Sequence, residues 1–148
     1  MLFRSHEYLF MAIDKFTKWV EVMPVPRQMA QAAIKFIEGI VYRFGVPNRI
    51  ISNGTQFTSK AFLNFCEEMG IKVCFASVSY PRRNGQVERA NAEVLKGLKT
   101  KAFDKLENKG KKWIDHLPSV LWSLRTTPSR ATGETPFFLV YGAEAVLP

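Results

Sequence analysis

The segment Arg49–Phe62, "RIISNGTQFTSKAF", is where residue types most strongly suggest chemistry. A short β-branched run ends in Ser52, and a helix-like segment follows. Strand ends of this kind often hold a carboxylate that binds a metal ion, yet no Asp or Glu lies between Glu38 and Glu67. The segment is therefore either an active-site strand end without its acid or simply a turn.

A second candidate lies on the long helix expected from Asn84 to about Phe103. At about 100° per residue, Lys96 and Lys99 fall within about 80° of Glu88 on this helix. One acid and two lysines would thus share a stripe. A carboxylate near a helix start is also stabilised by the helix dipole, and on geometry alone the reading of Glu88 as a helix-terminus charge is favoured.

The elements that must position these residues follow from the hydrophobic pattern. Apolar runs predict strands, and apolar residues at 3.6-residue spacing predict helices. We expect strands at Tyr8–Ile13, Trp19–Met23, Ile50–Ile51 and 71–77, and helices at Ala30–Phe44, from a Thr58 or Ser59 cap to Gly70, from Asn84 to about Phe103, and around Ile114–Leu124. The order β-β-α-β-α-β-α-α predicts an α/β fold: a hairpin beside parallel strands in one mixed sheet with helices on both faces.

The chain has 148 residues, which suits one domain over residues 1–148. Its net charge is +8, and ten basic against four acidic residues between Arg82 and Lys112 give that segment +6. A concentrated basic segment is typical of a polyanion binder, although a solvated helix face and a lysine-rich loop explain it as well. Two cysteines without a CxxC motif, Cys66 and Cys74, are expected to be free thiols, and no zinc site is expected.

Four motifs in order resemble the integrase catalytic core of gypsy-class LTR retrotransposons, most closely plant copies. They are "AIDKFTKWVE", "RFGVPNRIISNGTQFTS", "YPRRNGQVERAN" and "LWSLRTTPSRATGETPFFLVYG". The resemblance implies a ribonuclease-H-like fold, DNA as substrate, and nuclease and strand-transfer chemistry. It also implies two divalent cations, Mg²⁺ or Mn²⁺, held by three carboxylates.

Only one of the three family acids has a counterpart here. Glu88 matches the third acid. The second acid is absent from "SNGTQF", and because residues 53–87 span the family's interval before the third acid, Ser52 stands where an Asp is expected. A one-codon deletion explains this better than a substitution at Asn53. The first acid belongs to an opening strand that is expected to be truncated, and Asp14 matches a turn residue that is not a ligand.

The same resemblance suggests which residues meet DNA. Asn84, Gln86 and Lys96 match family positions near the scissile phosphate. The expected DNA-binding set also includes neighbouring residues of the basic segment: Arg82, Arg83 and Lys99. We expect weak, sequence-independent DNA binding, homo-oligomers as in the family, and no membrane association. No targeting signal is visible, and an intracellular, nuclear location is expected if the protein functions.

Three hypotheses follow. The first is a degenerate integrase core that has lost catalysis and retains DNA affinity. The second is an active polynucleotidyl transferase that recruits Asp14, Glu67 or Glu68, or relies on a partner chain. The third is a host interaction module that reuses the fold without nucleic acid. Magnesium-dependent cleavage would separate the second from the first, and binding that ignores salt would indicate the third.

Overall fold

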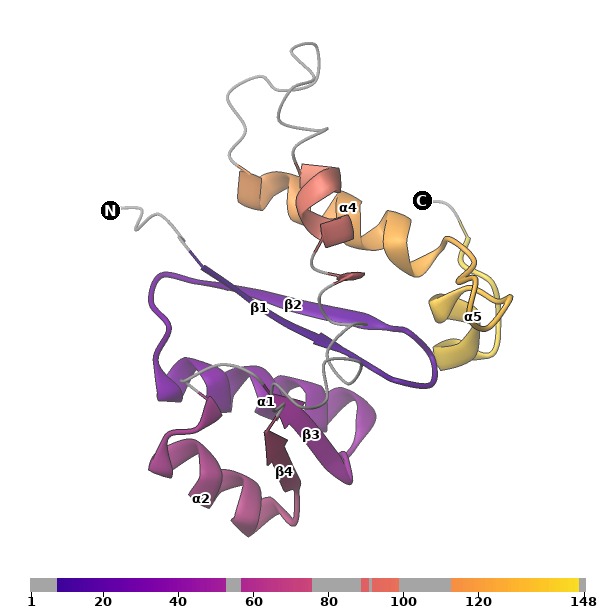
Figure 1. Ribbon diagram of the computed structural model, residues 1–148. Coiled ribbons are helices and arrows are strands. Elements are labelled where there is room, and N and C mark those ends of the chain that lie inside the picture. The colour runs from indigo at the N-terminus through magenta and orange to yellow at the C-terminus, as the bar shows by residue number, and fades with distance from the viewer. Residues whose placement is uncertain (1–7, 53–56, 76–88, 91, 99–112, 147–148) are drawn as a thin grey trace. The chain divides into compact units, whose positions relative to one another are not determined.

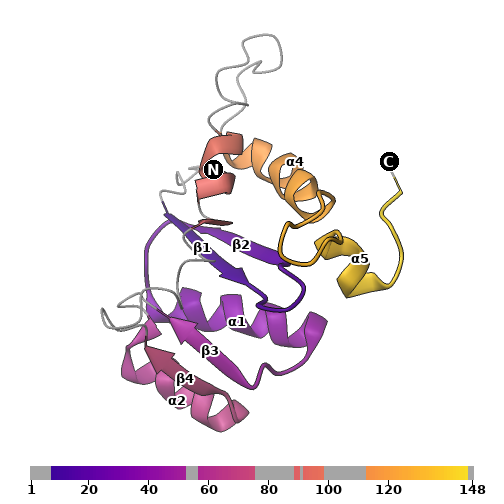
Figure 2. The ribbon, with the colours of Figure 1, turned by 45° about the vertical axis from the view of Figure 1, so that its right-hand side comes forward.

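A computed structural model describes residues 8–52, 57–75, 89–90, 92–98 and 113–146. The chain forms two compact units, and each is described by itself. Unit 1 comprises Met1–Phe10 and Val22–Gly85, and unit 2 comprises Met11–Glu21 and Gln86–Pro148. The strands and helices are shown in two views (Figure 1 and Figure 2).

The chain opens with a hairpin of β1 (Tyr8–Ile13) and β2 (Val20–Val25). The bounds of β1 are those predicted. For β2 the prediction was wrong, because the strand continues through Pro24 to Val25 instead of ending at Met23. Proline lacks the N–H that a sheet ladder uses, but among the described residues β2 hydrogen-bonds only to β1, so the Pro24 position can face away from that partner.

Unit 1 continues as an alternation of helices and strands. These elements are α1 (Ala30–Phe44), β3 (Arg49–Ser52), α2 (Lys60–Met69) and β4 (Lys72–Phe75). Gly45 ends α1 with φ at 89°, and Gly70 ends α2 with φ at 74°, both in the region that favours glycine. Ser59 caps α2 by accepting a hydrogen bond from the Phe62 amide at 3.3 Å. The predicted helices and their stops are therefore confirmed.

Strands β3 and β4 pair in parallel, as predicted, with Arg49 opposite Lys72 and Ser52 opposite Phe75. Figure 1 shows them side by side with α2 below. The expectation of one continuous mixed sheet was wrong for the described residues, in which β1–β2 and β3–β4 form separate two-stranded sheets. The resemblance places an opening strand upstream of the β1–β2 hairpin. Residues 1–7, which precede β1, lie outside the described residues.

Four phenylalanines pack against one another within unit 1. Phe57 lies between Phe10 and Phe62, with ring centroids at 5.5 and 5.3 Å, and Phe10 lies 6.0 Å from Phe36. Phe10, Phe36 and Phe62 are buried. This aromatic chain joins β1 to both helices, so unit 1 packs around side chains that come from distant parts of the sequence.

Unit 2 contains the hairpin turn, a helix over residues 89–90 and 92–98, α4 (Trp113–Arg125) and α5 (Pro136–Tyr141). Ala90, Val94 and Leu98 are buried, which confirms the predicted inner face of the long helix as far as it is described. Pro118 lies inside α4, which continues through it. Thr135 caps α5 by accepting from the Phe138 amide at 3.0 Å. Helix α5 was not predicted.

Candidate active site and nucleic-acid interface

Ser52 ends β3 at the position where the sequence comparison expects an acid. Ser52 is 7% exposed and lies opposite Phe75 in the parallel pairing of β3 with β4. Within the described part of the chain, the Ser52 Oγ is buried and has no hydrogen-bond partner. A buried hydroxyl without a partner costs about 1–3 kcal/mol. The strand end therefore holds a polar atom that the surrounding described residues do not satisfy.

The acids among the described residues do not form a metal site. Among the described residues, no group of three or more His, Cys, Asp or Glu side chains could hold a metal ion. Glu67 and Glu68 are exposed near the end of α2. Divalent magnesium prefers charged oxygen ligands, and a neutral hydroxyl is a poor substitute. The described residues thus do not fit a two-metal centre, and Glu88 lies outside them.

Asp14 has a structural role in the hairpin turn, as the sequence predicts. Its carboxylate accepts hydrogen bonds from the Thr17 amide at 2.9 Å and from the Thr17 hydroxyl at 2.6 Å. Its backbone N–H donates to the Trp19 carbonyl, and its carbonyl accepts from the Lys18 amide, both at 2.9 Å. The carboxylate oxygen that accepts both Thr17 bonds is engaged in holding this turn, as expected of a turn residue.

The helix over residues 89–90 and 92–98, called the basic helix below, presents one of the predicted DNA-binding residues to solvent. Lys96 is exposed on the helix whose opposite side buries Val94 and Leu98. Arg89, which belongs to the same basic segment, is also exposed. The other predicted DNA-binding residues lie outside the described residues: Arg82, Arg83, Asn84, Gln86 and Lys99. Their grouping with Lys96 stays a prediction.

Gly97 brings this helix close to α4. A Cβ built on Gly97 would lie 2.7 Å from Cγ1 and 3.3 Å from Cγ2 of Val120, which is itself buried. Because valine is stiff at χ1, the methyl groups have little freedom to move aside. Any larger residue at position 97 would push apart the two helices, one of which carries Lys96.

We expect Gly97→Ala to destabilise the protein by about 1–3 kcal/mol, because overpacking outweighs the gain of up to about 1 kcal/mol in helix propensity. Urea unfolding followed by circular dichroism measures this. The matched background is Val120→Ala, in which adding Gly97→Ala should cost little, since the contacted methyl groups are gone. A Gly97→Ala protein as stable as the unaltered chain would contradict the close approach.

A network that sequence reasoning missed joins α4 to the hairpin. The Arg125 guanidinium donates to the Val20 carbonyl from Nε at 3.0 Å and from Nη2 at 2.6 Å. It lies 3.5 Å from Glu21 Oε1 and 4.2 Å from the Trp19 ring centroid. The Trp19 indole N–H donates to Glu21 Oε1 at 2.6 Å. Arg125 and Val20 are 105 positions apart, so no local sequence pattern predicts their contact.

Comparison with known families identifies the family of this chain. Residues 3–81 match the family described as the integrase core domain. The chain belongs to the integrase core domain family. Gag-Pol polyproteins of retroviruses are similar to it: that of avian reticuloendotheliosis virus is 37% identical over 140 residues, and that of feline leukemia virus is 36% identical over 141. These matches cover 93% and 94% of this chain but only 12% and 8% of the polyproteins.

Solved structures place this integrase core domain in the ribonuclease-H-like fold. A simian T-cell lymphotropic virus intasome, solved with a PP2A regulatory subunit, has a TM-score of 0.79 and 22% identity, covering 95% of this chain and 50% of that one. The HTLV-2 integrase catalytic core, solved with magnesium in a trimeric form, has a TM-score of 0.75 and 21% identity, covering 94% and 90%. The predicted fold class is confirmed. The gypsy-class origin stays a prediction.

Proposed function

We propose that this integrase core domain binds DNA through phosphate contacts and does not itself carry out metal-dependent strand transfer. The observation that supports this proposal is the buried Ser52 hydroxyl at the end of β3. A buried neutral hydroxyl with no hydrogen-bond partner among the described residues ends the strand where the family's second acid is expected, and a hydroxyl cannot replace a carboxylate in a two-metal site.

Substitute acids receive no support from the geometry. The Asp14 carboxylate is engaged with Thr17 in the hairpin turn, and Glu67 and Glu68 are exposed on α2. These positions give no cluster of acids within the described ranges. Membership of the integrase family and the net charge of +8 support DNA as the partner, rather than a host module without nucleic acid.

The remaining parts of the proposal rest on resemblance. The four sequence motifs support an origin in a gypsy-class LTR retrotransposon, and a nuclear location would follow from DNA binding. Self-association is proposed because the HTLV-2 catalytic core was solved in trimeric and dimeric forms. In the described residues, no helix is long and apolar enough to cross a membrane.

The salt dependence of duplex binding tests the DNA proposal. If about three to five phosphates are contacted, the log–log slope of affinity against salt should be about −3 to −5. Replacing Lys96 and Lys99 by Ala should reduce that slope by about two. Anisotropy of labelled duplex at several salt concentrations provides the measurement.

The matched control replaces Lys60 and Lys72, which are exposed and lie outside the basic segment. Both double mutants lose two positive charges, so a general effect of net charge would weaken them equally. Equal loss, or an affinity that does not respond to salt, would reject the basic segment as the DNA-binding surface.

A further inference from the structure

The hairpin turn at residues 14–18 presents an aromatic ring to solvent on a well-defined backbone. Phe16 is 79% exposed at its tip. The bonds from Thr17 to the Asp14 carboxylate hold the turn on one side, and Lys18 adopts a positive φ of 62° on the other. The next residue, Trp19, is buried. The turn is thus fixed at its base, while Phe16 itself contributes little buried surface to folding.

Lysines flank this ring. The Lys15 ammonium lies 6.0 Å from the Phe16 ring centroid, and the Lys18 ammonium donates to the Lys15 carbonyl. The turn contains one acid, Asp14, whose carboxylate accepts hydrogen bonds within the turn. A single exposed aromatic residue is common on protein surfaces. An exposed ring with one lysine ammonium beside it and a second lysine in the same turn is more specific, because it combines a stacking surface with phosphate-binding groups.

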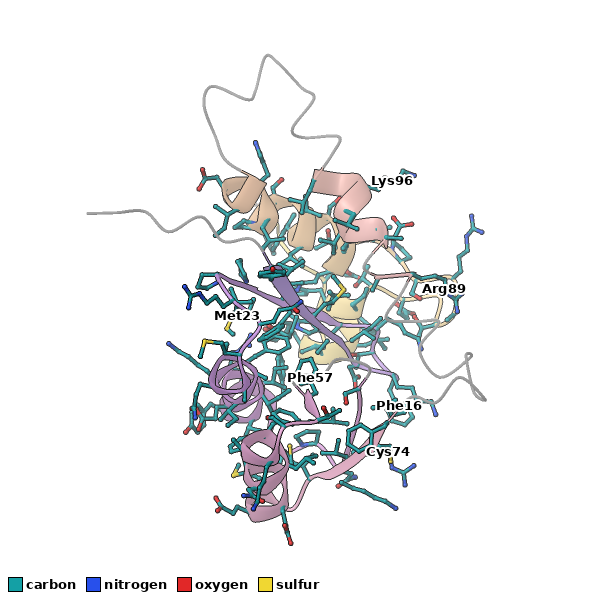
Figure 3. All side chains as sticks on the ribbon, turned by 60° about the vertical axis from the view of Figure 1, so that its left-hand side comes forward. Phe16, Met23, Phe57, Cys74, Arg89 and Lys96 are labelled. Carbon is teal, nitrogen blue, oxygen red and sulfur yellow. The ribbon has the colours of Figure 1, made fainter. Side chains whose placement is uncertain are left out.

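The position of the turn within unit 2 also favours a partner that carries phosphate groups. Unit 2 also contains the helix that carries Arg89 and Lys96, both exposed. Figure 3 shows Phe16, Arg89 and Lys96 along the same side of the view. The turn and this helix therefore both present positively charged side chains from the same unit. Charge complementarity favours a nucleic acid over a neutral or basic protein surface.

We propose that Phe16 stacks on an unpaired base of nucleic acid while Lys15 and Lys18 contact the flanking phosphates. Proteins that bind single strands combine positive charge with aromatic rings, because every base offers a stacking face. A base inside a duplex is not available to a ring at a turn tip. The turn should therefore prefer a single-stranded overhang to a blunt end. The inference rests on the proposed DNA binding and specifies the part of the DNA that this turn binds.

The test compares two labelled DNAs with the same number of nucleotides, a blunt duplex and a duplex with a single-stranded overhang. Phe16→Ala should weaken binding of the overhang DNA about five-fold or more and change blunt-duplex binding less than about two-fold. Phe16→Trp should retain the preference, and the added indole should be quenched by the overhang DNA. The matched control is Tyr42→Ala, since Tyr42 is 81% exposed on α1.

The outcomes separate this inference from the proposed function. If the unaltered protein binds both DNAs and Phe16→Ala weakens neither or both equally, stacking is wrong and the proposed function stands. If the protein binds no DNA at low salt, both are wrong. If Phe16→Ala leaves DNA affinity unchanged and reduces self-association in sedimentation, the ring is a protein contact and the inference is overturned.

Discussion

The purified protein, incubated with DNA ends and Mg²⁺ or Mn²⁺, is expected to give no nicked or joined product above a metal-free control. In-line phosphoryl transfer by two metals needs charged oxygen ligands that hold both ions in place. Ser52 offers only a hydroxyl, and the Asp14 carboxylate accepts two hydrogen bonds from Thr17. Gel analysis of end-labelled DNA over hours measures this directly.

Restoring a single acid is not expected to rescue the reaction. An Asp inserted between Ser52 and Asn53 gives the strand end its expected acid, but the described residues hold no cluster of acids that would complete a two-metal site around it. The informative second measurement is thermal melting with and without Mg²⁺, which should not differ, because a ligand stabilises a protein only if it binds the folded form. Cleavage by the unaltered protein that is abolished by Glu88→Gln would reject this prediction.

Arg125→Ala is expected to destabilise the protein by about 2–4 kcal/mol, less than the loss of one partner from a fully buried ion pair, because the Arg125 side chain is 21% exposed. Glu21 is 7% exposed, and the substitution removes its nearby cation, the two bonds to the Val20 carbonyl and the contact with Trp19. For a chain of this size, the melting temperature should fall by roughly 10 °C.

Three further variants identify the cause of that loss. Arg125→Lys keeps the charge but not the planar two-donor geometry, so its stability should be intermediate. Glu21→Gln keeps an acceptor for the Trp19 indole and should cost less than Arg125→Ala. Arg130→Ala, an exposed arginine of the same unit, should change melting very little. Arg125→Ala melting like Arg130→Ala would show that the network contributes no stability.

Elements with strong local signals were predictable from the sequence. Helix α1 has the predicted bounds, because its apolar stripe is regular and Gly45 supplies an unambiguous stop. Helix α5 has only six residues, too few for periodicity, although its start and end carried cap signals in Thr135, Pro136 and Gly142. Those cap residues could have located it.

Features that depend on tertiary context were not predictable. Pro24 reads as a strand stop, yet β2 passes through it because pairing with β1 prevails. The alternation in β4 predicts an inward Phe75, which is 49% exposed. Contacts such as that of Arg125 with Val20 leave no local trace. At the candidate site, the Ser52 strand end and the Asp14 turn were predicted from the sequence, whereas the burial of the Ser52 hydroxyl was found only in the structure.

The division of the described strands into two pairs has a consequence for handling this protein. Each sheet has two strands among the described residues, so all four are edge strands within that part of the chain, and backbone groups on strand edges can template aggregation. Pro24 in β2, and the charged Arg49 and Lys72 that begin β3 and β4, act as gatekeepers there. We therefore expect solubility to fall when these three residues are replaced by apolar ones, even where the melting temperature is unchanged.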